Sequence, residues 1–146
     1  MNIPLHEASH ACMAHLLGFE LVEVTATDKG GECKDSGPAP LFARGLDHRA
    51  VGLREALVAL APIAVNEELS SGDEACFARA LWLACLPQRE GLVRRDLIAL
   101  AREILRTREN RTAIAAVADQ LSRRKYLTGR EVAELIEATH RCGFIL

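Results

Sequence analysis

Residues 4–18 read PLHEASHACMAHLLG, and this stretch decides where the first helix lies and what it carries. A proline in the first turn of a helix lacks only an N–H that would have no partner there, and a glycine often ends a helix. We therefore predict a helix from Pro4 to about Leu17, ended by Gly18. The residues around its polar positions are small and apolar, which favours a buried helix; they are Ala8, Ala11, Cys12, Ala14 and Leu16.

Three polar residues of this helix, His6, Glu7 and His10, have the spacing HExxH. Residues four apart on a helix are separated by about 40° around its axis, so both imidazoles can reach one metal ion. Glu7 lies about 100° from His6 and can reach a water on that metal without ligating it. Zinc lowers the pKa of a bound water to about 7, and a nearby carboxylate can then accept its proton. The spacing predicts His6 and His10 as zinc ligands and Glu7 as the general base.

A catalytic zinc usually has three protein ligands and one open position, so a third donor must come from elsewhere. The candidate carboxylates cluster between residues 66 and 74; they are Glu67, Glu68, Asp73 and Glu74. Asp73 follows a break at residues 70–72, where the chain can return toward the first helix. Asp73 could equally be a helix N-cap, and the spacing alone does not choose between these roles. Cys76 could compete as a soft donor, although a buried thiol is the commoner outcome.

The remaining pattern predicts a mainly α fold, a small helical domain with one short strand region. Residues 19–27 alternate well enough for a strand, and residues 21–27 could either offer an edge to an extended peptide or be an ordinary structural strand. Residues 28–47 read as loop or short irregular strand. Residues 48–69 predict a helix kinked by Pro62, with 56–65 buried because they are apolar throughout. Further helices are expected over 73–85, over 91–125 as a hairpin or one bent helix, and after a capping box formed by Thr128 and Glu131.

Composition and charge narrow the functional classes. The chain has 146 residues and a formal net charge of -2, which fits one domain over residues 1–146 and gives no basic face for nucleic acid. Five cysteines without CxxC spacing indicate reduced thiols and a cytoplasmic protein. The longest uninterrupted apolar run, residues 56–65, is short of the roughly 20 residues that cross a bilayer, so no membrane segment is expected.

Four segments resemble the protease domain of the FtsH-type ATP-dependent zinc metallopeptidases. Residues 6–17 (HEASHACMAHLL) are similar to the HEAGHA helix of that family, and residues 56–69 (ALVALAPIAVNEEL) to its apolar helix ending in Glu-Glu-Leu. Residues 71–73 (SGD) resemble the segment whose aspartate is the third zinc ligand, and residues 101–132 its C-terminal helices. The resemblance implies a zincin-like domain with Zn²⁺ as cofactor and Asp73 as third ligand.

These observations predict a zinc metallopeptidase that hydrolyses peptide bonds in a protein or peptide substrate. The alternative is a non-catalytic zincin-fold binding or scaffolding module. A third reading, a short regulator protease that cleaves a repressor, calls for a partner-sensing domain that the sequence does not indicate. The chain contains no GxxxxGK[ST] motif, so ATP-driven unfolding would need a separate ATPase partner, and a homo-oligomer is compatible with the resemblance.

Overall fold

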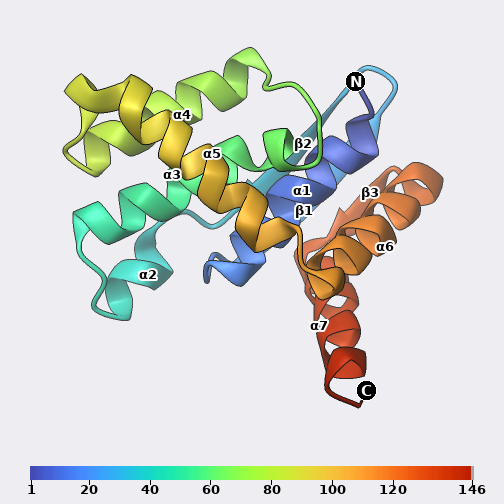
Figure 1. Cartoon of the computed structure of the whole chain (residues 1–146). Coiled ribbons are helices and arrows are strands. Elements are labelled where there is room, and N and C mark those ends of the chain that lie inside the picture. Colours follow the sequence, from blue (N-terminus) through green and yellow to red (C-terminus); the bar gives the residue numbers. More distant parts are fainter. Residues whose placement is uncertain (146) are drawn as a thin grey trace.

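The computed structural model describes residues 1–145, and at residues 88 and 142–145 it describes only the backbone. It is mainly helical with a small three-stranded sheet, as predicted (Figure 1). The elements in chain order are α1 (Ile3–Leu16), β1 (Leu21–Thr27), β2 (Gly30–Asp35), α2 (Ala39–Ala43), α3 (His48–Ala64), α4 (Ser71–Leu83), the 3₁₀ turn η1 (Pro87–Arg89), α5 (Glu90–Leu105), α6 (Arg108–Arg124), β3 (Tyr126–Thr128) and α7 (Gly129–Ile145).

Helix α1 is the centre of the fold, where it lies between α3 on one side and α6 on the other (Figure 1). Every residue from His6 to Ala14 is buried. Small side chains make this possible, because Ala8 and Ala11 allow neighbouring elements to approach the helix closely. The polar residues of the predicted site are thus held on a helix that is packed around its whole circumference.

Helix α3 contains the predicted buried segment, and Ala56, Leu60 and Ala61 are fully inaccessible to solvent. The helix ends at Ala64, earlier than the predicted residue 69, so Pro62 lies in its last turn and does not kink a longer helix. Asn66 then adopts a left-handed conformation with φ of 62°, which turns the chain toward α4. This turn precedes α4, the helix that carries Asp73 of the predicted site.

The sheet has the order β2-β1-β3, and all its pairs are antiparallel. Of the two roles left open for residues 21–27, the open edge is wrong and the ordinary structural strand is confirmed, because β1 is hydrogen-bonded on both sides. Strand β2 lies within residues 28–47, which were predicted as loop or short irregular strand, so the second alternative is confirmed for residues 30–35. The strand begins with Gly30 and Gly31, and because glycine is uncommon in strands these two residues weaken the strand pattern in the sequence.

The C-terminal third forms separate helices that cover different parts of the core. Helix α5 packs on α3, whereas α6 packs on α1, so the segment 91–125 is two diverging helices and neither a tight hairpin nor one bent helix. The predicted capping box is present: Thr128 Oγ1 accepts from Glu131 N at 3.1 Å, and Glu131 Oε1 accepts from Thr128 N at 3.2 Å. Within the described part of the chain, no helix combines the length and apolarity that crossing a membrane requires.

Candidate metal centre

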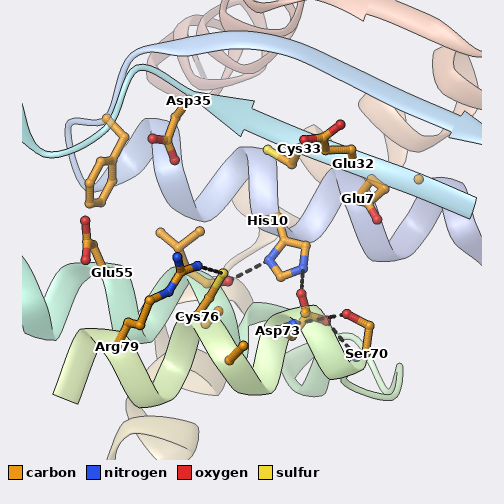
Figure 2. A pocket seen from close by; sticks show the side chains of 16 residues that line it. Glu7, His10, Glu32, Cys33, Asp35, Glu55, Ser70, Asp73, Cys76 and Arg79 are labelled. Carbon is orange, nitrogen blue, oxygen red and sulfur yellow. Dashed lines mark hydrogen bonds and ion pairs between the residues drawn. The ribbon is translucent and has the colours of Figure 1, made fainter. Parts of the chain in front are cut away.

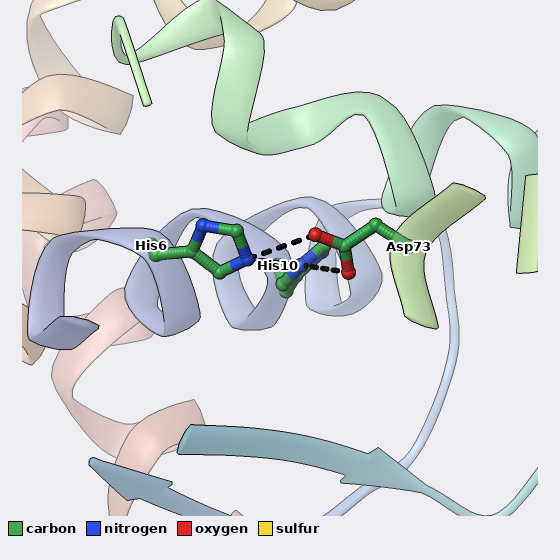
Figure 3. Close-up of side chains that lie close together, drawn as sticks. All are labelled: His6, His10 and Asp73. Atoms are coloured by element: carbon green, nitrogen blue, oxygen red, sulfur yellow. Dashed lines mark hydrogen bonds and ion pairs between the residues drawn. The ribbon is translucent and has the colours of Figure 1, made fainter. Parts of the chain in front are cut away.

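The side chains of His6, His10 and Asp73 converge on one point between α1 and the start of α4 (Figure 3). The Nε2 atoms of the two histidines lie 3.3 Å apart. Asp73 Oδ2 lies 2.9 Å from His6 Nε2, and Asp73 Oδ1 lies 3.0 Å from His10 Nε2. In the described residues this is the one group of three or more such donors that could hold a metal ion.

Asp73 is placed by the N-terminus of α4. Ser70 is the N-cap, and its Oγ accepts from Asp73 N at 3.1 Å. In return, Asp73 Oδ2 accepts from Ser70 N at 2.9 Å, which completes a capping box. The sequence left open whether Asp73 is an N-cap or a metal ligand. The N-cap is Ser70, Asp73 is the N3 residue of the capping box, and its carboxylate also faces the histidines.

One hydrogen bond of His10 fixes the tautomer of its neutral ring. Its Nδ1 lies 2.7 Å from the backbone oxygen of Val58 in α3, and because a carbonyl can only accept, Nδ1 carries the proton. Neutral His10 then has its lone pair on Nε2, the atom that faces His6 and Asp73. A backbone carbonyl behind a ligating histidine is the usual arrangement in protein metal sites. His6 lacks such a partner among the described residues, where its Nδ1 is buried without a hydrogen bond.

The donor set fits zinc. Two nitrogens bound tetrahedrally at zinc distances are separated by about 3.3 Å, which is the separation of the two Nε2 atoms. Two imidazoles and one carboxylate are also a donor set found in catalytic zinc sites. Although burial opposes ionisation of Asp73, hydrogen bonds to His10 and His6 hold its pKa well below its usual range, so it is present as a carboxylate. Three donors leave a fourth tetrahedral position for another molecule.

A proton can occupy the same cluster in place of a metal. Burial lowers the pKa of His10, but its contacts with Asp73 and the nearby charge of Glu7 outweigh that effect and raise the pKa overall. An imidazolium at His10 would pair with Asp73 at the 3.0 Å distance. The cluster is therefore a site for positive charge, either as a proton or as a metal cation.

Glu7 lies beside the cluster and outside the set of converging donors. It is 7% exposed and lines the same cleft as His10 (Figure 2). Burial raises the pKa of Glu7, and the neighbouring His10 and His6 partly offset this rise. Its position depends on Gly31 in β2, because a Cβ at that residue would be 2.6 Å from Glu7 Cγ.

The cluster opens into a cleft of about 670 Å³, bounded by α1, β2, α3 and the first turns of α4 (Figure 2). Glu7 and Ser70 lie toward one end, and Glu55 and Arg79 toward the other. Strand β2 lines this space with Gly31, Glu32, Cys33 and Asp35; it is an edge strand and pairs only with β1 among the described strands. The metal-capable group thus borders a cleft that has an edge strand in its wall.

The other candidate ligands lie elsewhere. Glu67 accepts from Asn2 N at 2.6 Å, and Glu74 pairs with Arg94 at 2.6 Å. Neither they nor Glu68 belong to the metal-capable group. Cys76 lines the cleft, but it is exposed and its Sγ lies 3.2 Å from Arg79 Nη2.

The sequence did not indicate the supporting groups Ser70, Val58 and Gly31. The Ser-x-x-Asp spacing typical of a capping box could have indicated Ser70. No sequence pattern indicates that the backbone oxygen of Val58 contacts His10.

No known protein-family model matches the chain, and no curated protein matches its sequence at a significant level. The function must therefore be inferred from the chemistry of the cluster and of the cleft around it.

Proposed function

We propose that the chain is a zinc-dependent metallopeptidase, similar to the protease domain of the FtsH-type enzymes, that hydrolyses peptide bonds in proteins or peptides. The observation that carries this proposal is the convergence of His6, His10 and Asp73 at donor separations that suit zinc, with the buried carboxylate of Glu7 next to them. A structural zinc site would be closed by a fourth protein ligand, whereas this set has three and borders an open cleft.

The residues divide into ligands and a base. His6, His10 and Asp73 would hold Zn²⁺, and Val58 and Ser70 orient His10 and Asp73. Bound zinc would supply a Lewis acid that acidifies a water molecule and polarises the carbonyl of the substrate. Glu7 accepts the proton of the attacking water and later delivers it to the leaving amine. The raised pKa of Glu7, which comes from burial, makes its carboxylate a stronger base.

The outer edge of β2 is the element that suits an extended peptide. A strand edge offers backbone N–H and C=O groups that can pair with a substrate of any sequence. Because β2 borders the cleft that contains Glu7, a peptide added to this edge would pass next to the proposed base. Such backbone binding selects unfolded or flexible segments, since a folded substrate has already paired its own backbone.

The resemblance to FtsH-type enzymes also suggests how the chain could be used. A separate ATPase partner or further copies of this chain would present unfolded substrates to the cleft. We place this activity in the cytoplasm, where the free thiols of Cys12 and Cys33 would stay reduced.

The test combines metal analysis with proteolysis. The purified chain is dialysed and its zinc content is measured by mass spectrometry, and cleavage of an unfolded protein such as casein is followed with and without a chelator. We expect about one zinc per chain, cleavage that stops with chelator, and recovery when zinc is added back. A chain that binds zinc tightly but cleaves none of a broad set of unfolded substrates contradicts the proposal.

A second candidate is a non-catalytic binding module with the same fold. The observation that favours it is that Asp73 lies within ion-pair distance of both histidines. A proton on one histidine can therefore hold the three side chains together without a metal. This reading expects no stoichiometric zinc after purification and no gain in thermal stability when zinc is added.

A further inference from the structure

The two helices that carry the donors of the metal centre are also joined at a second point. His6 and His10 belong to α1, whereas Asp73 belongs to α4. The connection between α3 and α4 lies beside the N-terminus of α1 (Figure 1), where Glu67 Oε1 accepts a hydrogen bond from Asn2 N at 2.6 Å. The two residues are 65 positions apart in the chain, so this hydrogen bond is a tertiary contact between the two parts of the site.

Asn2 organises the first turn of the helix that carries the histidines. It is the N-cap of α1, and its Oδ1 accepts from Leu5 N at 3.1 Å. Its backbone oxygen accepts from His6 N at 2.9 Å. The residue that Glu67 contacts is therefore hydrogen-bonded to the backbone of the first proposed zinc ligand.

A carboxylate is the favoured group at this end of a helix. The N-terminus of a helix has a partial positive charge and N–H groups without partners inside the helix. Helix α1 has no acidic residue in its first turn, so Glu67 supplies this negative charge from a distant segment. Glu67 is half-buried, whereas its neighbour Glu68 is exposed. The two adjacent glutamates thus have different environments, and only the first is held against α1.

The other side of Glu67 is connected to Asp73. The N–H of Glu67 donates to Pro62 O at 2.9 Å, which closes the turn at the end of α3. A few residues later, Ser70 N donates to Asp73 Oδ2 at 2.9 Å. The short segment 67–70 therefore has a hydrogen bond at each end. A displacement of Glu67 from α1 would move the start of α4 and, with it, the carboxylate that faces the histidines.

We infer that Glu67 is a positioning residue of the metal centre: its hydrogen bond to Asn2 N fixes the start of α4 against the start of α1 and so sets the reach of Asp73 to the two histidines. The inference rests on the metal centre of the proposed function and deepens it by naming the contact that arranges the donors before a metal binds. Glu67 lies outside the metal-capable group, so it acts through other residues. A site arranged in advance loses less freedom on binding, so the contact should raise zinc affinity.

The first test measures zinc affinity by competition with a fluorescent chelator. We expect Glu67→Ala to weaken zinc binding about tenfold, because it removes a charge-assisted hydrogen bond that holds the two helices together. Glu67→Gln keeps an oxygen that can accept from Asn2 N, so it should restore most of the affinity. Glu68→Ala, at the exposed neighbouring position, is the matched control and should bind zinc like the parent. Parental affinity in Glu67→Ala, or equal losses in Glu67→Ala and Glu68→Ala, would overturn the inference.

A second measurement separates positioning from a general loss of stability. Co²⁺ in place of zinc gives visible absorption bands whose intensity depends on the number and arrangement of its ligands. At saturating Co²⁺ we expect weaker bands in Glu67→Ala than in the parent, and bands like those of the parent in Glu67→Gln. Unchanged bands together with a lower melting temperature in Glu67→Ala would mean that Glu67 only stabilises the fold, which contradicts the inference.

A double-mutant cycle on the metal-free protein separates this inference from the peptidase proposal. Urea unfolding is measured for Glu67→Ala, Asp73→Ala and the double variant. The loss of stability in the double variant should be smaller than the sum of the single losses, because both substitutions release the same contact between α1 and α4. Glu68→Ala combined with Asp73→Ala should give additive losses.

The outcomes distinguish the two proposals. If the parent binds no zinc, or binds zinc and cleaves no peptide, the peptidase proposal fails, and a non-additive cycle for Glu67 and Asp73 leaves the positioning role standing. If the parent cleaves peptides in a zinc-dependent way and the cycle is additive, the positioning role is wrong and the peptidase proposal stands.

Discussion

Asp73 Oδ2 accepts a hydrogen bond from Ser70 N at 2.9 Å, so the carboxylate that faces the histidines is also part of the cap of α4. The same oxygen lies 2.9 Å from His6 Nε2. Helix capping and metal binding are therefore not competing roles for this residue. Experiments on Asp73 must measure both stability and metal affinity.

Replacement of Asp73 by alanine should weaken zinc binding by more than 100-fold, because two histidines alone are a poor site. It should also cost about 1 kcal/mol of stability without metal, because the capping box is lost. Zinc titration and thermal melts of the metal-free proteins measure the two effects.

Ser70→Ala should cost a similar amount of stability and leave most of the zinc affinity, since the Ser70 N–H remains. Glu74→Ala, which removes an exposed neighbour, should leave zinc affinity unchanged; an unchanged affinity in Asp73→Ala would exclude it as a ligand.

Replacement of Glu7 by glutamine should leave zinc bound and reduce hydrolysis by about 10²-fold or more, because the amide cannot accept a proton. The side chain keeps its size, so its packing beside Gly31 is preserved. Zinc content and peptide cleavage are measured on the same preparation. Parental cleavage rates in this variant would show that another group is the base.

Replacement of Gly31 by alanine should lower kcat/KM by about tenfold or more with little change in zinc affinity. The new Cβ would be 2.6 Å from Glu7 Cγ and 2.8 Å from the backbone oxygen of Thr25, so either Glu7 or β2 must move. Lys34→Ala, at an exposed position of the same strand, is the control and should keep parental kinetics. If Gly31→Ala also keeps them, the close approach of β2 to Glu7 has no catalytic role.

Replacement of Gly52 by alanine should destabilise the protein by about 1–3 kcal/mol, because its Cβ would be 2.5 Å from Ala84 N and 2.7 Å from Ala80 O in α4. The shift of α4 should also weaken zinc binding through Asp73. Gly91→Ala is the matched control: nothing lies within 4 Å of its Cβ, and alanine in α5 should add about 0.5–1 kcal/mol. Urea unfolding gives both values, and a neutral Gly52→Ala would contradict the tight α3–α4 contact.

Alkylation at pH 8 should label Cys76 and Cys85 quickly and Cys12 slowly. Cys76 and Cys85 are exposed, whereas burial raises the pKa of Cys12 to about 12, which leaves almost no thiolate at this pH. Mass spectrometry of the digested protein gives the rate for each residue, and denaturant should abolish the difference. Equal native rates would mean that α1 is not buried.

Part of the fold follows from local signals that need no tertiary information. The first helix was predicted within one residue at each end, because proline and glycine mark its ends. The capping box of Thr128 and Glu131 was likewise predicted, since it involves residues three apart. In contrast, β2 was left open between loop and short irregular strand, because Gly30 and Gly31 are typical of loops. At Gly31 the reason for glycine is the approach of Glu7 from another element, which sequence spacing does not contain.

In the candidate metal centre too, some features follow from local sequence signals and others depend on tertiary contacts. The sequence by itself determined that His6 and His10 share one face of a helix with Glu7 beside them, because helical periodicity fixes the directions of residues one and four apart. The spacing did not choose between Asp73 and the glutamates Glu67, Glu68 and Glu74, which have the same chemistry and nearby positions, although the family resemblance implied Asp73. Only the tertiary structure gives the physical reason: α4 packs on α3, α3 packs on α1, and these contacts bring the Asp73 carboxylate to the histidines and leave the three glutamates outside the group.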